Sequence, residues 1–101
     1  MTYNLQLIAI KCIEAQELNG DEVVIKLNGA KVWQSGRYRL HPRPTHDDQV
    51  SEFDFAGGRR HGAAGWEMLT PYNPKDFVFT SLSGDSLFEV WEADFLRNDF
   101  L

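Results

Sequence analysis

Short runs in which apolar and polar residues alternate make up most of the chain, and turn residues separate them. In the clearest run, 23–27, alternate residues share an apolar face, and a second β-rich run at 30–34 follows Asn28-Gly29. Alternation is typical of half-buried strands, and Asn-Gly between two such runs is the strongest short-range hairpin signal. The sequence therefore predicts strands at 23–27 and 30–34 joined by a tight turn.

Further strand-like runs occur at 3–13, 37–40, 50–55, 66–70, 77–82 and 86–91. The first is apolar at both alternating sets of positions, which predicts a strand covered on both faces, although a short buried helix has the same pattern. The run at 66–70 fits a short strand or a helical turn. The last two runs are predicted to form an antiparallel pair through a tight turn at 83–85.

Two segments between these runs are predicted to be irregular. The segment 41–48 contains two prolines, which bar regular structure. The segment 57–65 contains four glycines and is predicted to be a mobile or tightly turned connection. About six to eight short strands remain, with turn signals mostly every 8–12 residues or so and no long helical period, so we expect an all-β antiparallel β-sandwich.

The composition fits a single globular domain spanning residues 1–101. The chain has 101 residues, 43% of them hydrophobic, and 15 acidic against 10 basic residues give a formal net charge of −5. An acidic surface repels phosphate backbones, so we expect no nucleic-acid partner. Anionic membranes are disfavoured for the same reason, unless a metal ion bridges the charges.

The single cysteine, Cys12, lies in an apolar run, which excludes an internal disulfide and favours a small buried side chain. No signal peptide precedes the first strand-like run, and no apolar stretch approaches the ~18–20 residues of a membrane helix. We therefore expect a cytoplasmic protein.

Acidic residues gather at the end of the chain. Residues 84–101 contain five acids against the single base Arg97. Glu92 ends the strand predicted around 86–91, Asp94 follows two residues later, and Asp99 follows five residues after that. Carboxylates at this spacing after a strand can turn several oxygens toward one point, as Ca²⁺ requires with six to eight oxygen ligands at ~2.3–2.6 Å.

The segment 91–101, Trp-Glu-Ala-Asp-Phe-Leu-Arg-Asn-Asp-Phe-Leu, resembles the third calcium-binding loop of C2 domains. The segment 10–33, with its acidic loop, Asp21 and the Lys-Leu-Asn-Gly-Ala-Lys-Val-Trp hairpin, is similar to the opening of bacterial C2-like modules. The resemblance implies a C2-like sandwich in which both loops lie at one tip. It also implies a candidate Ca²⁺ site made by Asp21, Glu92, Asp94 and Asp99, with Glu17 or Glu22 in reserve.

The sequence departs from the C2 pattern at three points. Glu92 stands where the family usually has its first aspartate, and the stretch between Asp94 and Asp99 is one residue shorter than in many C2 loops. The chain also stops at Leu101, where the family supplies a glycine and a final strand. We therefore expect an open sheet edge that a partner, a second copy or a terminal residue covers.

Other interpretations of the same residues stay open. The acids around Glu92 could form a solvated loop in which Arg97 pairs with one of them. The segment 41–48 holds His41, His46, Asp47 and Asp48, which could form a metal or general-base site but also fit an ordinary surface loop. The run Gly57-Gly-Arg-Arg-His-Gly62 suggests a phosphate cradle but lacks the strand-loop-helix context of a P-loop.

These observations predict a non-enzymatic binding module with a candidate Ca²⁺ site and a protein partner, reaching membranes only through Ca²⁺. The alternative is a metal-free interaction or self-association domain that acts through an open sheet edge. A small enzyme built on the segment 41–48 is the third hypothesis, and no serine or cysteine is paired with histidine and a carboxylate at a recognisable spacing to support it.

Overall fold

The computed structural model describes residues 1–93 and 98–100, the last three by their backbone, and it is all-β and sandwich-like, which confirms the predicted fold class. The described strands are β1 (Tyr3–Gln6), β2 (Ala9–Lys11), β3 (Glu22–Leu27), β4 (Ala30–Gln34), β5 (Arg39–Leu40), β6 (Gln49–Asp54), β7 (Arg59–Gly62), β8 (Gly65–Met68), β9 (Val78–Leu82), β10 (Phe88–Ala93) and β11 (Asn98–Phe100). A short 3-10 turn, η1 (Pro74–Phe77), precedes β9. These eleven described strands exceed the predicted number because the segment 3–13 forms two strands and because β7 and β11 lie in segments where no strand was predicted.

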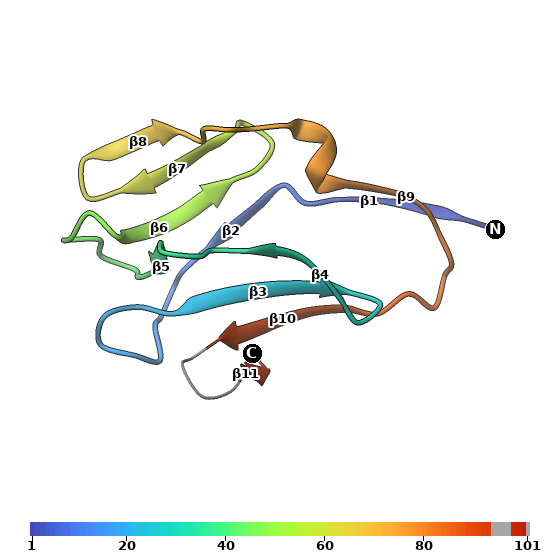
Figure 1. Ribbon diagram of the computed structural model, residues 1–101, viewed down its shortest axis with the longest axis horizontal. Helices are drawn as coiled ribbons and strands as arrows, with labels where there is room; N and C mark the ends of the chain where they lie inside the picture. Colours follow the sequence, from blue (N-terminus) through green and yellow to red (C-terminus); the bar gives the residue numbers. More distant parts are fainter. Residues whose placement is uncertain (94–97, 101) are drawn as a thin grey trace.

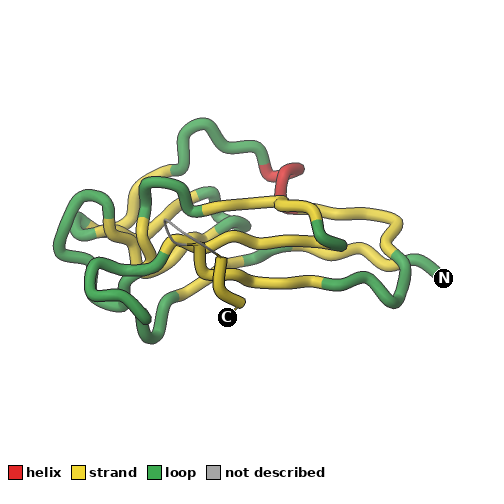
Figure 2. Tube along the Cα trace, turned by 60° about the horizontal axis from the view of Figure 1, so that its bottom comes forward, coloured by secondary structure: helices red, strands yellow, loops and turns green. Residues whose placement is uncertain are grey.

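Two strand layers face each other across the core (Figure 1). One is a four-stranded sheet in the order β11-β10-β3-β4, and the other follows the order β2-β6-β7-β8 with β5 also pairing with β6. A separate two-stranded ribbon, β1-β9, runs beyond these sheets toward the N-terminus (Figure 1). The pairing is antiparallel except between β5 and β6. Figure 2 shows η1 outside the strand layers.

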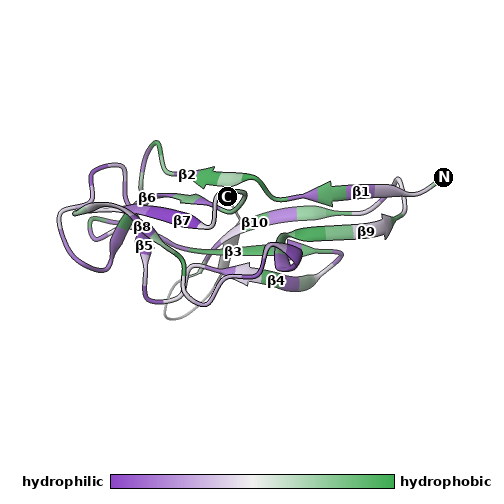
Figure 3. Ribbon diagram, turned by 90° about the horizontal axis from the view of Figure 1, so that it is seen from above, coloured by the Kyte–Doolittle hydropathy of each residue, from purple (hydrophilic) through white to green (hydrophobic). Residues whose placement is uncertain are grey.

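The core lies between β3 and β6. Val23 and Ile25 of β3 and Phe53 of β6 are all less than 5% exposed, and Figure 3 shows β3 as mainly hydrophobic and β7 as hydrophilic. Trp33 of β4 packs edge-on against Phe53, with ring centroids 4.9 Å apart. This aromatic contact joins the two layers.

A β-bulge allows β6 to bury residues at uneven spacing. Val50 and Phe53 are three positions apart, so a regular strand would place them on opposite faces. The pairing register with β7 shifts between Val50 and Glu52, and both Val50 and Phe53 are buried. The extra residue, Ser51, therefore shifts the side-chain alternation by one position, so that Val50 and Phe53 both face the core.

The segment 3–13 is not the single strand, covered on both faces, that its pattern predicted. It forms β1, which pairs with β9, and β2, which pairs with β6. Between them Leu7 is buried and Ile8 is 56% exposed. The chain changes sheets at this point, and each short strand has one face in solvent.

The strands β9 and β10 do not pair with each other, so the hairpin predicted from residues 77–91 is wrong. β9 pairs with β1, whereas β10 pairs with β3 and β11. The turn at Ser83-Asp85 instead carries the chain from the β1-β9 ribbon to the four-stranded sheet, and Asn28 of the β3-β4 turn forms two hydrogen bonds with the backbone of Leu87.

The glycine-rich segment 57–65 is more regular than predicted. Its centre forms β7, which pairs with β6 on one side and with β8 on the other. Gly57 and Gly58 form the turn before β7, and a Cβ on Gly58 would meet the ring of Tyr72 at 2.8 Å. The region 66–70, predicted as a strand or a helical turn, contributes the strand β8.

Candidate functional site

The strand register brings the two predicted acidic segments to one end of the four-stranded sheet. Glu22, the first residue of β3, is directly opposite Ala93 at the end of β10, and Asp21 precedes Glu22. On the other edge of β10, position 92 is directly opposite position 99 of β11. Asp94 lies outside the described residues, and of Asp99 the structure describes only the backbone.

Asp21 is buried, and its carboxylate organises the acidic loop that precedes it. One carboxylate oxygen accepts the backbone N–H of Gln16 at 3.0 Å, and the other accepts that of Glu17 at 3.1 Å. The Asp21 backbone forms an isolated bridge with Leu40, with hydrogen bonds of 2.9 and 2.8 Å. These contacts give Asp21 a structural role, because they fix the loop 16–20 against the start of β3.

Glu92 is the second buried carboxylate at this end, with 2% of its surface exposed. It is directly opposite Val23 of the core, so its side chain shares the inner face of the sheet. Of the two reserve ligands, Glu22 is half-buried and Glu17 is exposed. Within residues 1–93 and 98–100, no three His, Cys, Asp or Glu side chains are grouped so that they could hold a metal ion.

Cys12 is half-buried beside this end of the molecule. Burial and the nearby Asp21 carboxylate raise the pKa of its thiol. Because the thiolate is the reactive form, both effects make Cys12 less reactive. Its packing against the core supports the predicted role as a small hydrophobic side chain.

The proline-rich segment 41–48 is irregular, as predicted, and the buried amide of Gln49 holds it in place. The Gln49 side-chain oxygen accepts hydrogen bonds from the backbone of Thr45 and His46, and its nitrogen donates to the carbonyl of Asn19 at 3.1 Å. The same amide therefore ties this segment to the acidic loop. Sequence reasoning missed Gln49, because one polar residue before a strand carries no distinctive pattern.

Among the described residues, His41 and His46 belong to no group of three His, Cys, Asp or Glu side chains that could hold a metal ion. His46 is exposed, and the ring nitrogen Nδ1 of His41 accepts the backbone N–H of Arg43 at 3.0 Å. This hydrogen bond to His41 is a local contact within a turn, and such contacts order exposed loops.

A cluster of arginine and aromatic side chains on β7 and β8 was not predicted. The Arg60 guanidinium lies 3.8 Å from the centre of the Tyr38 ring and pairs with Glu67 at 2.6 Å. The Arg59 guanidinium lies 4.1 Å from the centre of the Trp66 ring. The sequence signal was the Arg-Arg pair in the run that suggested a phosphate cradle, whereas both side chains belong to the strand β7 and stack on rings.

Ser51 and His61 form a second contact that the sequence did not predict. The Ser51 hydroxyl oxygen lies 3.1 Å from Nδ1 of His61 and 3.4 Å from the His61 carbonyl oxygen. The contact sits at the bulge of β6, where an extra residue leaves backbone groups in need of partners. A structural role at the bulge accounts for the contact between Ser51 and His61.

No protein-family model matches the chain, and neither the search of curated proteins nor the search of solved structures found a similar protein. The described part of the chain also contains no helix long and apolar enough to cross a membrane.

Proposed function

We propose that the protein is a non-enzymatic binding module of C2-like type that binds Ca²⁺ at its acidic end, defined here as positions 21, 92, 94 and 99. The ion would then recruit a protein partner, or a membrane, that the net charge of −5 disfavours without it. We also place the protein in the cytoplasm, where a lone unpaired cysteine is ordinary.

The strand register carries this proposal. Positions 92 and 99 are directly opposite each other on adjacent strands, and Asp21 is two residues before Val23, the other cross-strand neighbour of Glu92. Positions directly opposite each other on adjacent strands are close enough for two carboxylates to bind one divalent cation.

The hydrogen bonds of Asp21 are compatible with a further ligand. A carboxylate has about four acceptor sites, and the two N–H groups of the loop occupy two of them. The same N–H groups fix the orientation of the carboxylate before an ion arrives, which lowers the entropic cost of binding.

The experiment is a set of thermal melts in EDTA, in millimolar Ca²⁺ and in millimolar Mg²⁺. Ca²⁺ alone is expected to raise Tm by several degrees, since an ion that binds only the folded state stabilises it by RT ln(1+[Ca²⁺]/Kd). The double variant Asp94→Asn/Asp99→Asn is expected to lose the shift. Asp76→Asn, which removes an exposed acid in η1, is the matched control and should keep it.

Three outcomes count against the proposal. No shift in Ca²⁺ rejects the ion site. An equal shift in Mg²⁺ indicates charge screening instead of a Ca²⁺ site. A full Tm shift in the double variant shows that Ca²⁺ binds somewhere other than the acidic end.

A further inference from the structure

The outer edge of β8 is open, and it presents apolar side chains. In the described residues β8 pairs with β7 alone, at the end of the order β2-β6-β7-β8. Trp66 is 43% exposed and Met68 is 65% exposed. A strand edge with exposed apolar residues is a template on which a further strand can pair.

The phase of the β7-β8 ladder determines which backbone groups face outward. The N–H of Leu69 donates to the carbonyl of Gly58 at 2.8 Å. Hydrogen-bonded pairs alternate in an antiparallel ladder, so Glu67, opposite Arg60, also bonds to β7. The N–H and C=O groups of Trp66 and Met68 therefore point toward the open edge.

We propose that two copies of this chain pair edge to edge through antiparallel β8 strands, with Trp66 opposite Met68 of the second copy. This arrangement joins the two β8-edged sheets into one continuous sheet across a two-fold axis at Glu67. The inference goes beyond the calcium proposal and does not depend on it.

The residue pattern of β8 favours a second copy as the occupant. The segment Trp66-Glu67-Met68 is apolar-charged-apolar, so a two-fold axis at Glu67 places apolar side chains opposite apolar side chains on one face. On the other face, each Glu67 is already paired with Arg60 at 2.6 Å. The axis therefore brings together two neutral ion pairs and not two bare carboxylates.

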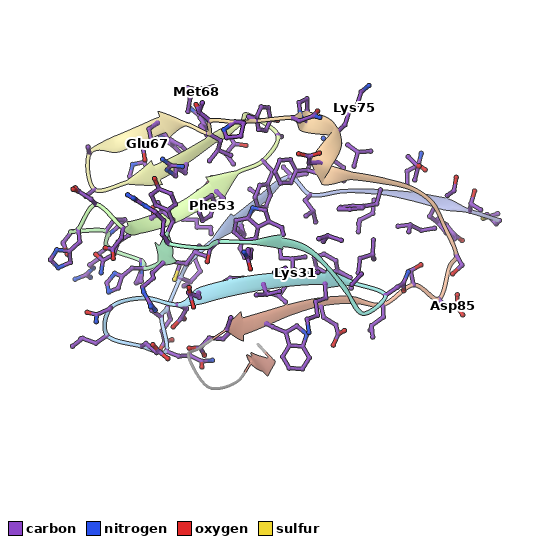
Figure 4. All side chains as sticks on the ribbon, viewed as in Figure 1. Lys31, Phe53, Glu67, Met68, Lys75 and Asp85 are labelled. Atoms are coloured by element: carbon purple, nitrogen blue, oxygen red, sulfur yellow. The ribbon has the colours of Figure 1, made fainter. Side chains whose placement is uncertain are left out.

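Two other sheet edges carry a feature that discourages strand addition. Exposed lysines lie on β4 (Lys31) and on β2 (Lys11), and a lysine on an edge strand opposes pairing because its charge would be desolvated. β8 contains neither lysine nor proline, and its register with β7 is regular along all four residues. Figure 4 shows Glu67 and Met68 on this strand at the margin of the molecule.

The test is sedimentation equilibrium of the metal-free protein in EDTA, from about 5 to about 500 μM, because a short edge interface is weaker than a standard one. The expected result is a monomer–dimer equilibrium. Met68→Pro removes an N–H that faces the open edge, so dimerisation should fall at least tenfold with little change in Tm. Glu67→Pro removes an N–H that bonds to β7, so this variant, unlike Met68→Pro, should lower Tm.

Two further variants keep the test decisive if Met68→Pro fails to fold. Trp66→Lys should abolish the dimer, whereas Leu18→Lys, at a residue 92% exposed in the acidic loop, should leave it intact. A monomer at every concentration overturns the proposal. A dimer that survives Trp66→Lys, or one that Leu18→Lys also abolishes, overturns it as well, because the contact would then lie elsewhere or be non-specific.

Discussion

Arg60 and Glu67 occupy directly opposite positions of β7 and β8, and their side chains form an ion pair of 2.6 Å. The two members differ in exposure, with 15% of the Arg60 side chain and 54% of the Glu67 side chain accessible. The Arg60 guanidinium also covers the ring of Tyr38 and donates to its hydroxyl at 2.8 Å. Arg60 therefore does more than balance a charge, because it closes the margin of the core between the two layers.

Arg60→Ala should lower the free energy of unfolding by about 1–3 kcal/mol, since it removes a stacked, largely buried side chain and leaves Tyr38 uncovered. Glu67→Gln should cost only about 0.2–1 kcal/mol, because its carboxylate is mostly in solvent. Urea unfolding of both variants and of the double variant measures these values. Equal losses for the two single variants would contradict the packing role of Arg60.

Gly20 makes the close approach between the acidic loop and β5 possible. It has a φ of +99°, and a Cβ built there would meet the Leu40 carbonyl oxygen at 2.9 Å. Gly20→Ala should therefore destabilise the fold by about 2–4 kcal/mol, from backbone strain and from loss of the Asp21–Leu40 bridge. Gly29 is the matched control, because it has a φ of +83° with nothing within 4 Å of the added Cβ. Gly29→Ala should cost about 1 kcal/mol, and a similar loss for both variants would show that the contact with Leu40 is unimportant.

Local chemistry explains which parts of the fold could be predicted from the sequence. The hairpin 23–34 was predicted because Asn28 and Gly29 adopt the positive φ angles, 52° and 83°, that a tight hairpin turn requires. Ser83-Gly84-Asp85 has similar turn residues, but the strands on either side find partners far along the chain. Pairing of this kind depends on which faces fit together, and alternation within a run does not contain that information.

The positions of the acidic residues were predictable to the same extent. The resemblance placed positions 21, 92 and 99 at one end, and the register sets position 92 opposite position 99, with Asp21 directly before β3. The hydrogen bonds of the Asp21 carboxylate could not be predicted, because they depend on the path of the loop 16–20. The contact between Arg60 and Tyr38 joins residues 22 positions apart, and its residue types alone would fit many other pairings.

The structural role of the Asp21 carboxylate can be tested in the absence of calcium. In EDTA, Asp21→Ala should lower the free energy of unfolding by about 1–3 kcal/mol, because two backbone N–H groups lose their acceptor beside a buried position. Asp21→Asn keeps one acceptor oxygen and should lose less. Urea unfolding checks both values. If Asp21→Ala is as stable as the native protein without metal, the carboxylate is not holding the loop.

Asp54 is expected to make the stability of the fold depend on pH. A hydrogen bond from the backbone N–H of Gly57 and the ion pair with Arg59 at 2.9 Å hold the pKa of the Asp54 carboxyl below its usual 3.8. A carboxyl with a lowered pKa in the folded state contributes stability above its unfolded pKa, and that contribution is lost as the pH falls through the lower, folded value. Asp54→Asn should therefore be less stable than the native protein near neutral pH, and the difference should shrink below about pH 4. Urea midpoints measured from about pH 2 to pH 7 check this, with Asp76→Asn as the control for removing an exposed acid. A difference that stays constant over the whole range would show that Asp54 acts through packing and not through its charge.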